Sequence, residues 1–267
     1  MPVLSERPLA EFPIGNVTLH AHHQRLTGIT VAARAWIHPE DLSRLVPGSI
    51  STLTDESGTP LAWTGEAPDP SQSVLAPGSF MIVQTWDLLR ANESWVGSIS
   101  EDCIEGEVHA NAVVEGTLQL GKGSRILPGV YLEGNVIIGE NCKIGPNCYI
   151  RGNTSIGDKC HIGQSVEIKN SIILSRTNVG HLSYVGDSIL GADANLGAGT
   201  ITSNFRHDGG NHRTMVDGEL VDTGRRKFGT IIGDRVHTGI NTSIYPGRKL
   251  FAGTSTLPGA IVSRDVQ

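Results

Sequence analysis

Two basic side chains, Arg151 and Lys169, occupy equivalent places in a repeating pattern and lie eighteen residues apart. Each directly follows an isoleucine, at a position where other repeats often carry glycine. If the repeats stack, the two cations lie about 5 Å apart and repel unless an anion or an acid neutralises them. Glu133, eighteen residues before Arg151, could be that acid in a solvated ladder of charges. The alternative is a clamp for a phosphate group.

His181 is the candidate general base, because imidazole titrates close to neutral pH. It lies between the aliphatic position Leu174 and Tyr184, which are ten residues apart where two repeats would require twelve. We expect this phase slip to redirect side chains, as a bulge does beside a site in a sheet. A lone histidine is more often structural, but its place in an interruption of a long repeat favours a functional role.

The elements that must position these residues are predicted by a period of six. Neither a helix nor an ordinary strand has this period, whereas short strands joined by tight turns, three hexads to a coil, do. Hexapeptide repeats of this kind resemble those of a left-handed parallel β-helix, in which each aliphatic stacks on the residue eighteen positions later, about 4.8 Å away. The aliphatic series is Val108, Val114, Leu120, Ile126, Leu132, Ile138, Ile144, Ile150, Ile156, Ile162, Ile168 and Leu174, and it resumes at Leu190, Leu196, Ile232, Ile244, Leu250 and Val262.

The small residues two places before the aliphatics should also point inward. They include Cys142, Cys148 and Cys160, which we therefore expect to be inert core thiols. The glycines that follow many of the aliphatics, such as Gly121 and Gly139, are expected to supply the unusual backbone angles of a corner.

Composition agrees with this mainly β fold. Of 267 residues, 33 are glycine, 38% are hydrophobic and 18% are charged, with a net charge of −6. This much glycine disfavours a helix-rich fold, and the ordinary aliphatic content disfavours disorder. The mild acidity argues against a nucleic-acid or anionic-membrane partner. No apolar run is long enough to span a bilayer, so we expect a cytoplasmic protein.

A polar excursion interrupts the repeat over residues 203–228. It contains turn residues at 208–211, a possible hairpin at 216–220 and a basic end at 224–227. A long loop on a rigid scaffold usually carries function, although a solvated charge run is the simpler interpretation of the basic end.

Several motifs together carry a family resemblance. Residues 181–187 and 195–204 resemble the acetyltransferase domain of the bifunctional glucosamine-1-phosphate acetyltransferase / N-acetylglucosamine-1-phosphate uridylyltransferase family. Residues 147–151, 166–169, 222–227, 231–234 and 239–241 are closer to the archaeal-type version. The resemblance spans residues 85–267 and is most specific over 147–241.

For the amino-sugar phosphate, the resemblance implies a site between the subunits of a homotrimer. Arg151 and Lys169 would hold the phosphate, with Tyr184 and Lys227 assisting. Asn195 would position the sugar. No nucleic-acid or membrane partner is implied.

For the chemistry, the resemblance implies that His181 takes a proton from the sugar amine while the backbone N–H of Ala198 stabilises the oxyanion. Asn204 would lie near the thioester of acetyl-CoA, and Ile240, in the coils after residue 230, near its pantetheine arm. Phe205 stands where the bacterial enzymes typically carry tyrosine, so a hydroxyl contact is lost there. No metal is required.

The first 100 residues are expected to form a small α+β domain, followed by the β-helix over 101–267. Residues 7–16, with a short helix over 17–26, resemble the part of sugar nucleotidyltransferases that follows their catalytic loop. A hairpin is predicted over 51–63 and a helix over 86–92. The catalytic Gly-rich loop and any lysine are missing from this stretch, which predicts a truncated nucleotidyltransferase-like domain without uridylyltransferase activity. The histidines at 20, 22 and 23 are interpreted as surface residues rather than a metal site.

The function predicted is transfer of acetyl from acetyl-CoA to the amine of glucosamine-1-phosphate or galactosamine-1-phosphate, by direct attack. One alternative on this fold, a trimeric zinc carbonic anhydrase, needs three converging histidines, and His161, His181 and His237 lack the usual spacing. Another alternative is a non-catalytic trimeric scaffold or a regulatory protein that binds sugar phosphates. The sequence does not choose between the two hexosamines.

Overall fold

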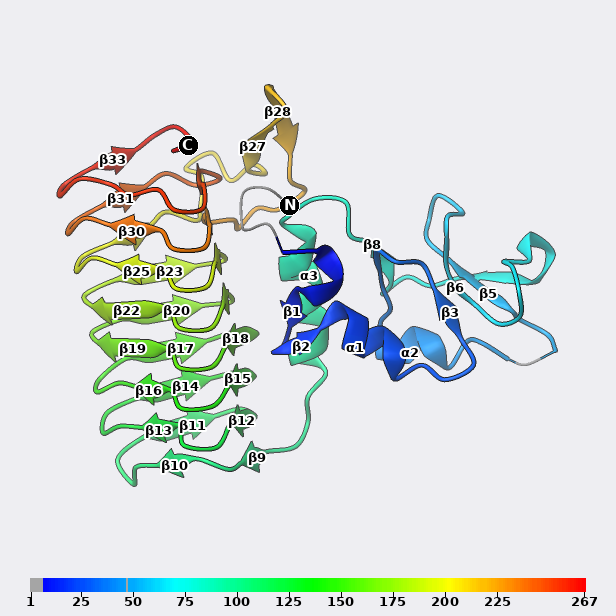
Figure 1. Ribbon diagram of the computed structural model, residues 1–267, viewed down its shortest axis with the longest axis horizontal. Helices are drawn as coiled ribbons and strands as arrows, with labels where there is room; N and C mark the ends of the chain where they lie inside the picture. The colour runs from blue at the N-terminus through cyan, green and yellow to red at the C-terminus, as the bar shows by residue number, and fades with distance from the viewer. Residues whose placement is uncertain (1–6, 47) are drawn as a thin grey trace.

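The fold is a left-handed parallel β-helix with a smaller α+β part packed against one side (Figure 1). A computed structural model describes residues 7–46 and 48–267. The coils are built from three parallel sheets, each named here after its first strand. The β9 sheet contains β9 (Cys103–Ile104), β12 (Leu118–Leu120), β15 (Val136–Ile138), β18 (Thr154–Ile156), β21 (Ile172–Ile173), β24 (Ile189–Leu190), β29 (Ile231–Ile232) and β32 (Lys249–Leu250).

The other two sheets complete each triangular coil. The β10 sheet contains β10 (Glu107–Val108), β13 (Arg125–Ile126), β16 (Lys143–Ile144), β19 (His161–Gln164), β22 (Asn178–His181), β25 (Asn195–Leu196) and β30 (His237–Thr238). The β11 sheet contains β11 (Val113–Glu115), β14 (Tyr131–Glu133), β17 (Tyr149–Arg151), β20 (Glu167–Lys169), β23 (Tyr184–Gly186), β26 (Ile201–Thr202), β31 (Ser243–Ile244) and β33 (Ile261–Val262).

The interior is the predicted aliphatic stack, with one error. Ile150 pairs with Leu132 below and Ile168 above, and all three are buried in one cluster with Cys142 and Cys148. Burial raises the pKa of the Cys148 thiol to about 12, which agrees with an inert core residue. The exception is Leu174. Ile173 takes the inward position that was predicted for Leu174, between Ile156 and Leu190. Leu174 packs outside the β-helix.

The phase slip lies elsewhere than predicted. Ile150 pairs with Ile168 and Ile156 with Ile173, so the corner after β20 is one residue shorter than the corner below it. The next corner, after β23, keeps this shorter length. Between Ile173 and Val185 the six-residue phase is intact, so His181 does not lie in an interruption.

Some corner glycines serve a different purpose from the one predicted, although Gly145, which follows Ile144, does have a positive φ of 97°. Gly121 and Gly139 have ordinary backbone angles, and a Cβ on Gly121 would lie 2.6 Å from the carbonyl carbon of Gly139 in the next coil. These positions need glycine because the coils approach closely there. The left-handed backbone falls two or three residues after an aliphatic, for example at Asn141, three after Ile138, and at Asn170, two after Ile168. Asparagine tolerates that conformation better than most side chains.

The α+β part contains the predicted hairpin and the predicted helix over 86–92, which extends further. Its strands form two-stranded and four-stranded sheets: β1 (Pro13–Ile14), β2 (Val17–Thr18), β3 (Thr30–Val31), β4 (Ala35–Trp36), β5 (Thr52–Thr54), β6 (Pro60–Trp63), β7 (Ser73–Leu75) and β8 (Phe80–Met81). Its helices are η1 (Leu9–Glu11), α1 (Leu19–Gln24), α2 (Pro39–Leu42), η2 (Pro70–Gln72) and α3 (Asp87–Gly97). The helix predicted over 17–26 is shorter because Val17 and Thr18 form β2, and Thr18 caps α1.

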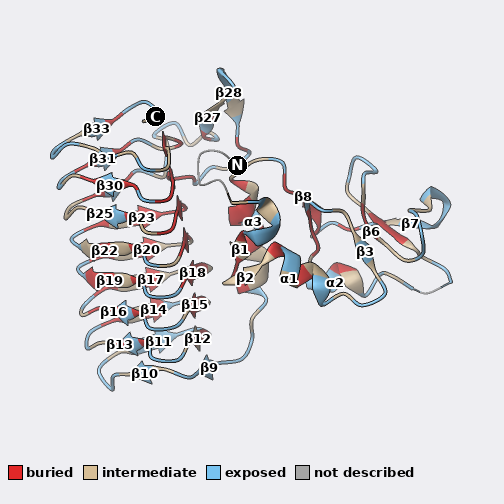
Figure 2. Ribbon diagram, in the orientation of Figure 1, coloured by how far each residue is buried: buried red, intermediate tan, exposed pale blue. Residues whose placement is uncertain are grey.

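Helix α3 joins the two parts. Its buried residues, among them Leu88 and Leu89, lie in one cluster with Leu174 and Ile189 on the outside of the β9 sheet. Figure 2 shows buried residues on α3 and along the neighbouring strands. The side chain of Asn92 on α3 accepts a hydrogen bond from the Ser155 hydroxyl of β18 at 2.8 Å. This side of the β-helix is therefore covered by the chain's own residues.

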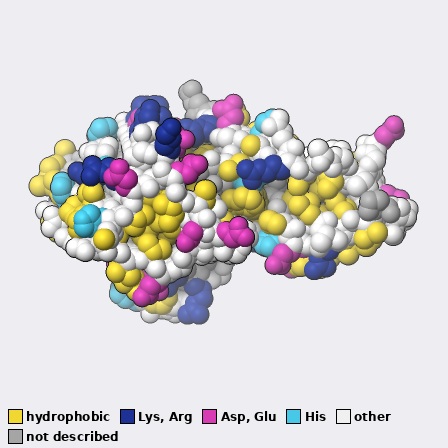
Figure 3. Space-filling model, turned by 90° about the horizontal axis from the view of Figure 1, so that it is seen from below, with side chains coloured by type: hydrophobic (Ala, Val, Ile, Leu, Met, Phe, Trp, Pro, Cys, Tyr) yellow, Lys and Arg dark blue, Asp and Glu magenta, His cyan; other side chains and the backbone are white. Residues whose placement is uncertain are grey.

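The excursion forms the predicted hairpin, β27 (Arg213–Val216) and β28 (Glu219–Asp222), which projects beside the upper coils (Figure 1). At the opposite end the first coil has no coil below it. Ile104, Val113 and Val114 are exposed there, and Figure 3, seen from that side, shows hydrophobic side chains on the surface of the β-helix.

A pair of glycines one coil apart tests the close-approach argument. A Cβ on Gly163 would lie 1.9 Å from the carbonyl oxygen of Gly180, whereas a Cβ on Gly180 would meet nothing within 4 Å. We expect Gly163→Ala to lower the free energy of unfolding by about 1–3 kcal/mol, as overpacking does. Gly180→Ala should change it by less than about 0.5 kcal/mol. Chemical denaturation measures both values, and equal losses would contradict the argument.

His22 predicts how stability depends on pH. Contrary to the interpretation as a surface residue, it is buried between Trp36 and Trp95, with ring centroids 5.1 and 4.6 Å away, and burial lowers its pKa from 6.5 to about 4. Between these pH values the unfolded chain binds more protons than the folded chain, so stability falls as the pH falls. Denaturation monitored by tryptophan fluorescence should show this loss, and His22→Gln should reduce it. An unchanged pH dependence in His22→Gln would count against this role.

Candidate active site

The predicted column of charges is present at the corner between the β11 and β9 sheets. Strand pairing aligns Glu133, Arg151, Lys169 and Gly186 in consecutive coils. The acid that balances each cation differs from the prediction, however. Glu133 accepts a hydrogen bond from the hydroxyl of Tyr149, so the simple ladder is wrong.

Two acids that the sequence analysis missed neutralise the pair. The guanidinium of Arg151 contacts the carboxylate of Glu167 at 2.8 Å, and the Lys169 Nζ contacts Asp187 Oδ2 at 2.8 Å. The two ion pairs differ in burial. The side chains of Arg151 and Glu167 are each about one-third exposed, whereas that of Asp187 is only 3% exposed. Lys169 is thus the more firmly held of the two cations.

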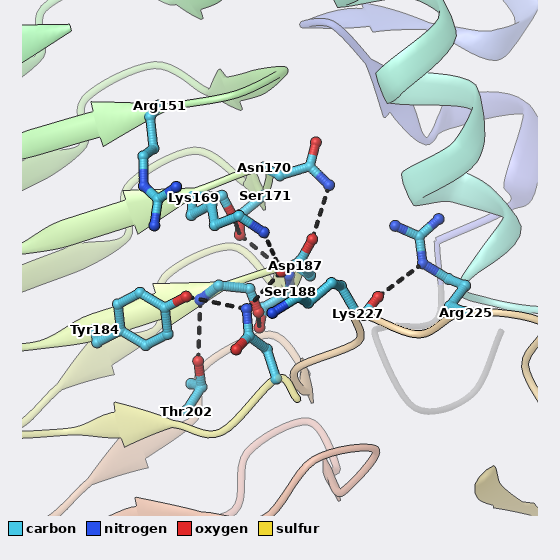
Figure 4. Close-up of polar contacts among 12 residues, drawn as sticks. Arg151, Lys169, Asn170, Ser171, Tyr184, Asp187, Ser188, Thr202, Arg225 and Lys227 are labelled. Atoms are coloured by element: carbon cyan, nitrogen blue, oxygen red, sulfur yellow. Dashed lines mark hydrogen bonds and ion pairs between the residues drawn. The ribbon is translucent and has the colours of Figure 1, made fainter. Parts of the chain in front are cut away.

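Asp187 is the centre of a polar cluster (Figure 4). Besides Lys169, its Oδ2 accepts a hydrogen bond from the Asn204 amide at 2.6 Å, and its Oδ1 accepts one from the Asn170 amide at 3.0 Å. Buried carboxylates are stable only when paired and hydrogen-bonded in this way. Asn170 and Asp187 both lie in the shortened corners, in consecutive coils. The sequence reveals that Asn170 and Asp187 are neighbours only once the seventeen-residue spacing between these coils is known.

Tyr184 and Lys227 are brought to the same cluster from different elements. The Tyr184 hydroxyl accepts a hydrogen bond from the Asn204 amide at 3.0 Å, and partial burial raises the pKa of Tyr184 above its ordinary value. Lys227 is placed by a bridge between its backbone and that of Phe205, and its Nζ lies 3.9 Å from the Phe205 ring centroid. The two ends of the excursion therefore meet beside β23.

His181, Ala198 and Ile240 lie at the other edge of the β11 sheet, where it meets the β10 sheet. They follow one another in consecutive coils, and the carbonyl of Ala198 accepts a hydrogen bond from the backbone N–H of Asn241 at 2.7 Å. Within residues 7–46 and 48–267 the N–H of Ala198 has no protein acceptor, as an oxyanion donor requires. His181 is exposed. Tyr184 begins β23, the strand that leads from this edge to the cluster around Asp187.

The remaining candidate residues are spread over the outer surface. Asn195 is exposed on β25, between Asn178 and His237 in the same column. Phe205 is 43% exposed and lines a cavity of about 570 Å³ together with Arg206 and Tyr245. Among the described residues there is no group of three or more His, Cys, Asp or Glu side chains that could hold a metal ion.

Comparison with known proteins shows which sequences this chain resembles. Residues 132–249 match the model of the GMPPB C-terminal domain. A bifunctional sugar-1-phosphate nucleotidylyltransferase/acetyltransferase from Sulfurisphaera tokodaii is 40% identical over 185 residues, which are 69% of this chain and 46% of that protein. The bifunctional protein GlmU of Methanococcus maripaludis strain C7 is 50% identical over 184 residues, 68% of this chain and 44% of that protein. Over about two thirds of its length, this chain is therefore similar to bifunctional nucleotidylyltransferase/acetyltransferases.

The similarity to these proteins covers only part of their length. The chain spans less than half the length of the curated relatives given above. Among solved structures, the acetyltransferase domain of PglB from Neisseria gonorrhoeae is similar with a TM-score of 0.31 and 12% identity, over 66% of this chain and 64% of that one. Across the described part of the chain, no helix is both long and apolar enough to cross a membrane.

The two ion pairs predict different effects of removing their acids. Asp187→Ala leaves Lys169 and two amides without their buried partner, so we expect the free energy of unfolding to fall by about 3 kcal/mol. Glu167→Ala breaks a pair that is one-third exposed and should cost less than about 1 kcal/mol. Urea denaturation of both variants measures the difference. A larger loss in Glu167→Ala would contradict this ranking.

Proposed function

We propose that this protein is an N-acetyltransferase that moves acetyl from acetyl-CoA to the amine of glucosamine-1-phosphate or galactosamine-1-phosphate. The observation that carries the proposal is the cluster of Arg151, Lys169, Tyr184 and Lys227 on the β-helix. Guanidinium and ammonium groups bind phosphate through charge-assisted hydrogen bonds. The nucleotidylyltransferase/acetyltransferase named among the relatives supports acetyl transfer as the reaction.

In the proposed reaction the sugar amine attacks the carbonyl carbon of the acetyl-CoA thioester. His181 accepts the proton that the amine loses, and the N–H of Ala198 donates a hydrogen bond to the oxyanion of the tetrahedral intermediate. The carbon–nitrogen bond is retained when the carbon–sulfur bond breaks, and CoA leaves as its thiol after protonation. Asn195 orients the sugar. No covalent enzyme intermediate or metal is part of this mechanism.

The acetyl-CoA would be held beside Asn204, Phe205 and Ile240. The cavity lined by Phe205, Arg206 and Tyr245 supports this, because aromatic rings and a cation suit a nucleotide with phosphate groups. Residues 1–100 form a truncated nucleotidyltransferase-like domain in this proposal. They contain no lysine for a triphosphate, and we propose that they have no uridylyltransferase activity, which incubation with UTP, Mg²⁺ and the acetylated sugar phosphate tests.

We also propose a homotrimer with the site between subunits. Exposed apolar side chains flank the edge that carries His181, among them Leu182 at 65%, Ile240 at 54% and Leu257 at 79%. A neighbouring subunit would cover them, and its surface would then lie beside His181. Large exposed apolar patches of this kind mark interaction surfaces.

Release of free CoA tests the function directly. With acetyl-CoA and glucosamine-1-phosphate or galactosamine-1-phosphate, the unchanged protein should release CoA, and His181→Ala should lower kcat/KM by about 10²–10⁴ through loss of the general base. His109→Ala, at an exposed position in the first coil, serves as the control and should retain full activity.

Two outcomes would count against the proposal. No release of CoA with either hexosamine phosphate would favour the non-catalytic scaffold or the regulatory protein that binds sugar phosphates. Full activity in His181→Ala would leave the reaction but remove its proposed base.

A further inference from the structure

One side chain of the α+β part, Glu93 on α3, makes polar contacts beside the cluster centred on Asp187. Its carboxylate forms a two-pronged ion pair with Arg225, with Nη1 of Arg225 3.1 Å from Oε2 and Nη2 on Oε1. Oε1 also accepts a hydrogen bond from the Asn170 amide at 2.6 Å. The side chains of Arg225 and Glu93 are only 17% and 27% exposed. This is therefore a shielded, geometrically specific pair.

Arg225 also contacts Lys227. Its Nε donates a hydrogen bond to the carbonyl of Lys227 at 3.3 Å, as Figure 4 shows. The same guanidinium thus joins α3 to the backbone of the residue whose ammonium lies over Phe205. Without the acid, Arg225, Arg226 and Lys227 form three adjacent cations that repel one another.

Asn170 links Glu93 to the start of the excursion. The same amide nitrogen that contacts Glu93 also contacts Asp187, and Asp187 in turn holds Lys169 and Asn204. Glu93 is therefore linked to both ends of residues 203–228, directly to Arg225 near the end and through Asn170 and Asp187 to Asn204 at the start. These contacts join segments 77 and 132 residues apart in the chain.

We propose that Glu93 is a positioning residue: it fixes both ends of the 203–228 excursion and so sets where Asn204 and Lys227 lie. The α+β part then acts on the β-helix site without contributing a reacting group. The effect on acetyl transfer rests on the proposed function, whereas the effect on the loop does not.

Hydrogen–deuterium exchange of residues 203–228 in the full chain tests the effect on the loop. We expect Glu93→Ala to speed exchange there by about tenfold, since a hydrogen-bonded ion pair is lost. Glu93→Gln keeps an acceptor oxygen and should give an intermediate rate. The control is Glu219→Gln, an exposed acid on β28, which should exchange as the unchanged protein does. Exchange in Glu93→Ala equal to that of the control would overturn the proposal.

Measurement of KM and kcat tests whether Glu93 affects substrate binding through the position of the excursion. Glu93→Ala should raise the KM for the amino-sugar phosphate by about tenfold and change kcat by less than about threefold, because binding is lost rather than the general base. Glu93→Gln should recover part of the affinity. A fall in kcat alone would overturn the positioning role. If the unchanged protein releases no CoA, the proposed function fails, and the exchange rates still decide whether Glu93 holds the loop.

Discussion

Parallel pairing between successive coils is the constraint on which the rest of the molecule depends. Because each strand is hydrogen-bonded to the strand one coil away, an outward side chain lies over a counterpart eighteen or seventeen residues along the chain, or further along where the excursion intervenes. This brings Arg151 and Lys169 together. At about 5 Å and an effective dielectric constant near 20, two such charges repel by about 3 kcal/mol. The aliphatic stack inside the coils opposes this repulsion, and Glu167 and Asp187 offset it locally.

The shortened corners after β20 and β23 give the site its shape. Each lacks one residue relative to the corner below β20, and together they carry Lys169, Asn170 and Asp187. A buried carboxylate at this point requires several donors, and they come from Lys169 and Asn170 in the preceding coil and from Asn204 at the start of the excursion. The departure from the repeat and the polar cluster therefore occupy the same place. A regular six-residue corner would leave the register of these side chains different by one residue.

The sequence predicts the regular part of this structure well, because a period of six and a single inward aliphatic per hexad leave few alternatives. It predicts the stacking of Arg151 on Lys169 for the same reason. It fails where one residue more or less changes the register, as at Leu174, since Ile173 and Leu174 are equally apolar and only contacts with the α+β part distinguish them. The repeat pattern could not predict the roles of Glu93 and Asp187, because their partners come from segments distant in the chain.

The unequal burial of the two ion pairs determines how the cluster could receive an anion. Lys169 is held by a carboxylate that is almost completely buried, so its position is set before any ligand arrives. Arg151 is paired with Glu167 at the surface, where an ion pair is worth less than about 1 kcal/mol, so a phosphate can replace that acid at little cost. Lys227 lies over an aromatic ring rather than beside an acid. These three cations exceed the two acids by one charge, and the excess is carried by Lys227 at the end of the excursion.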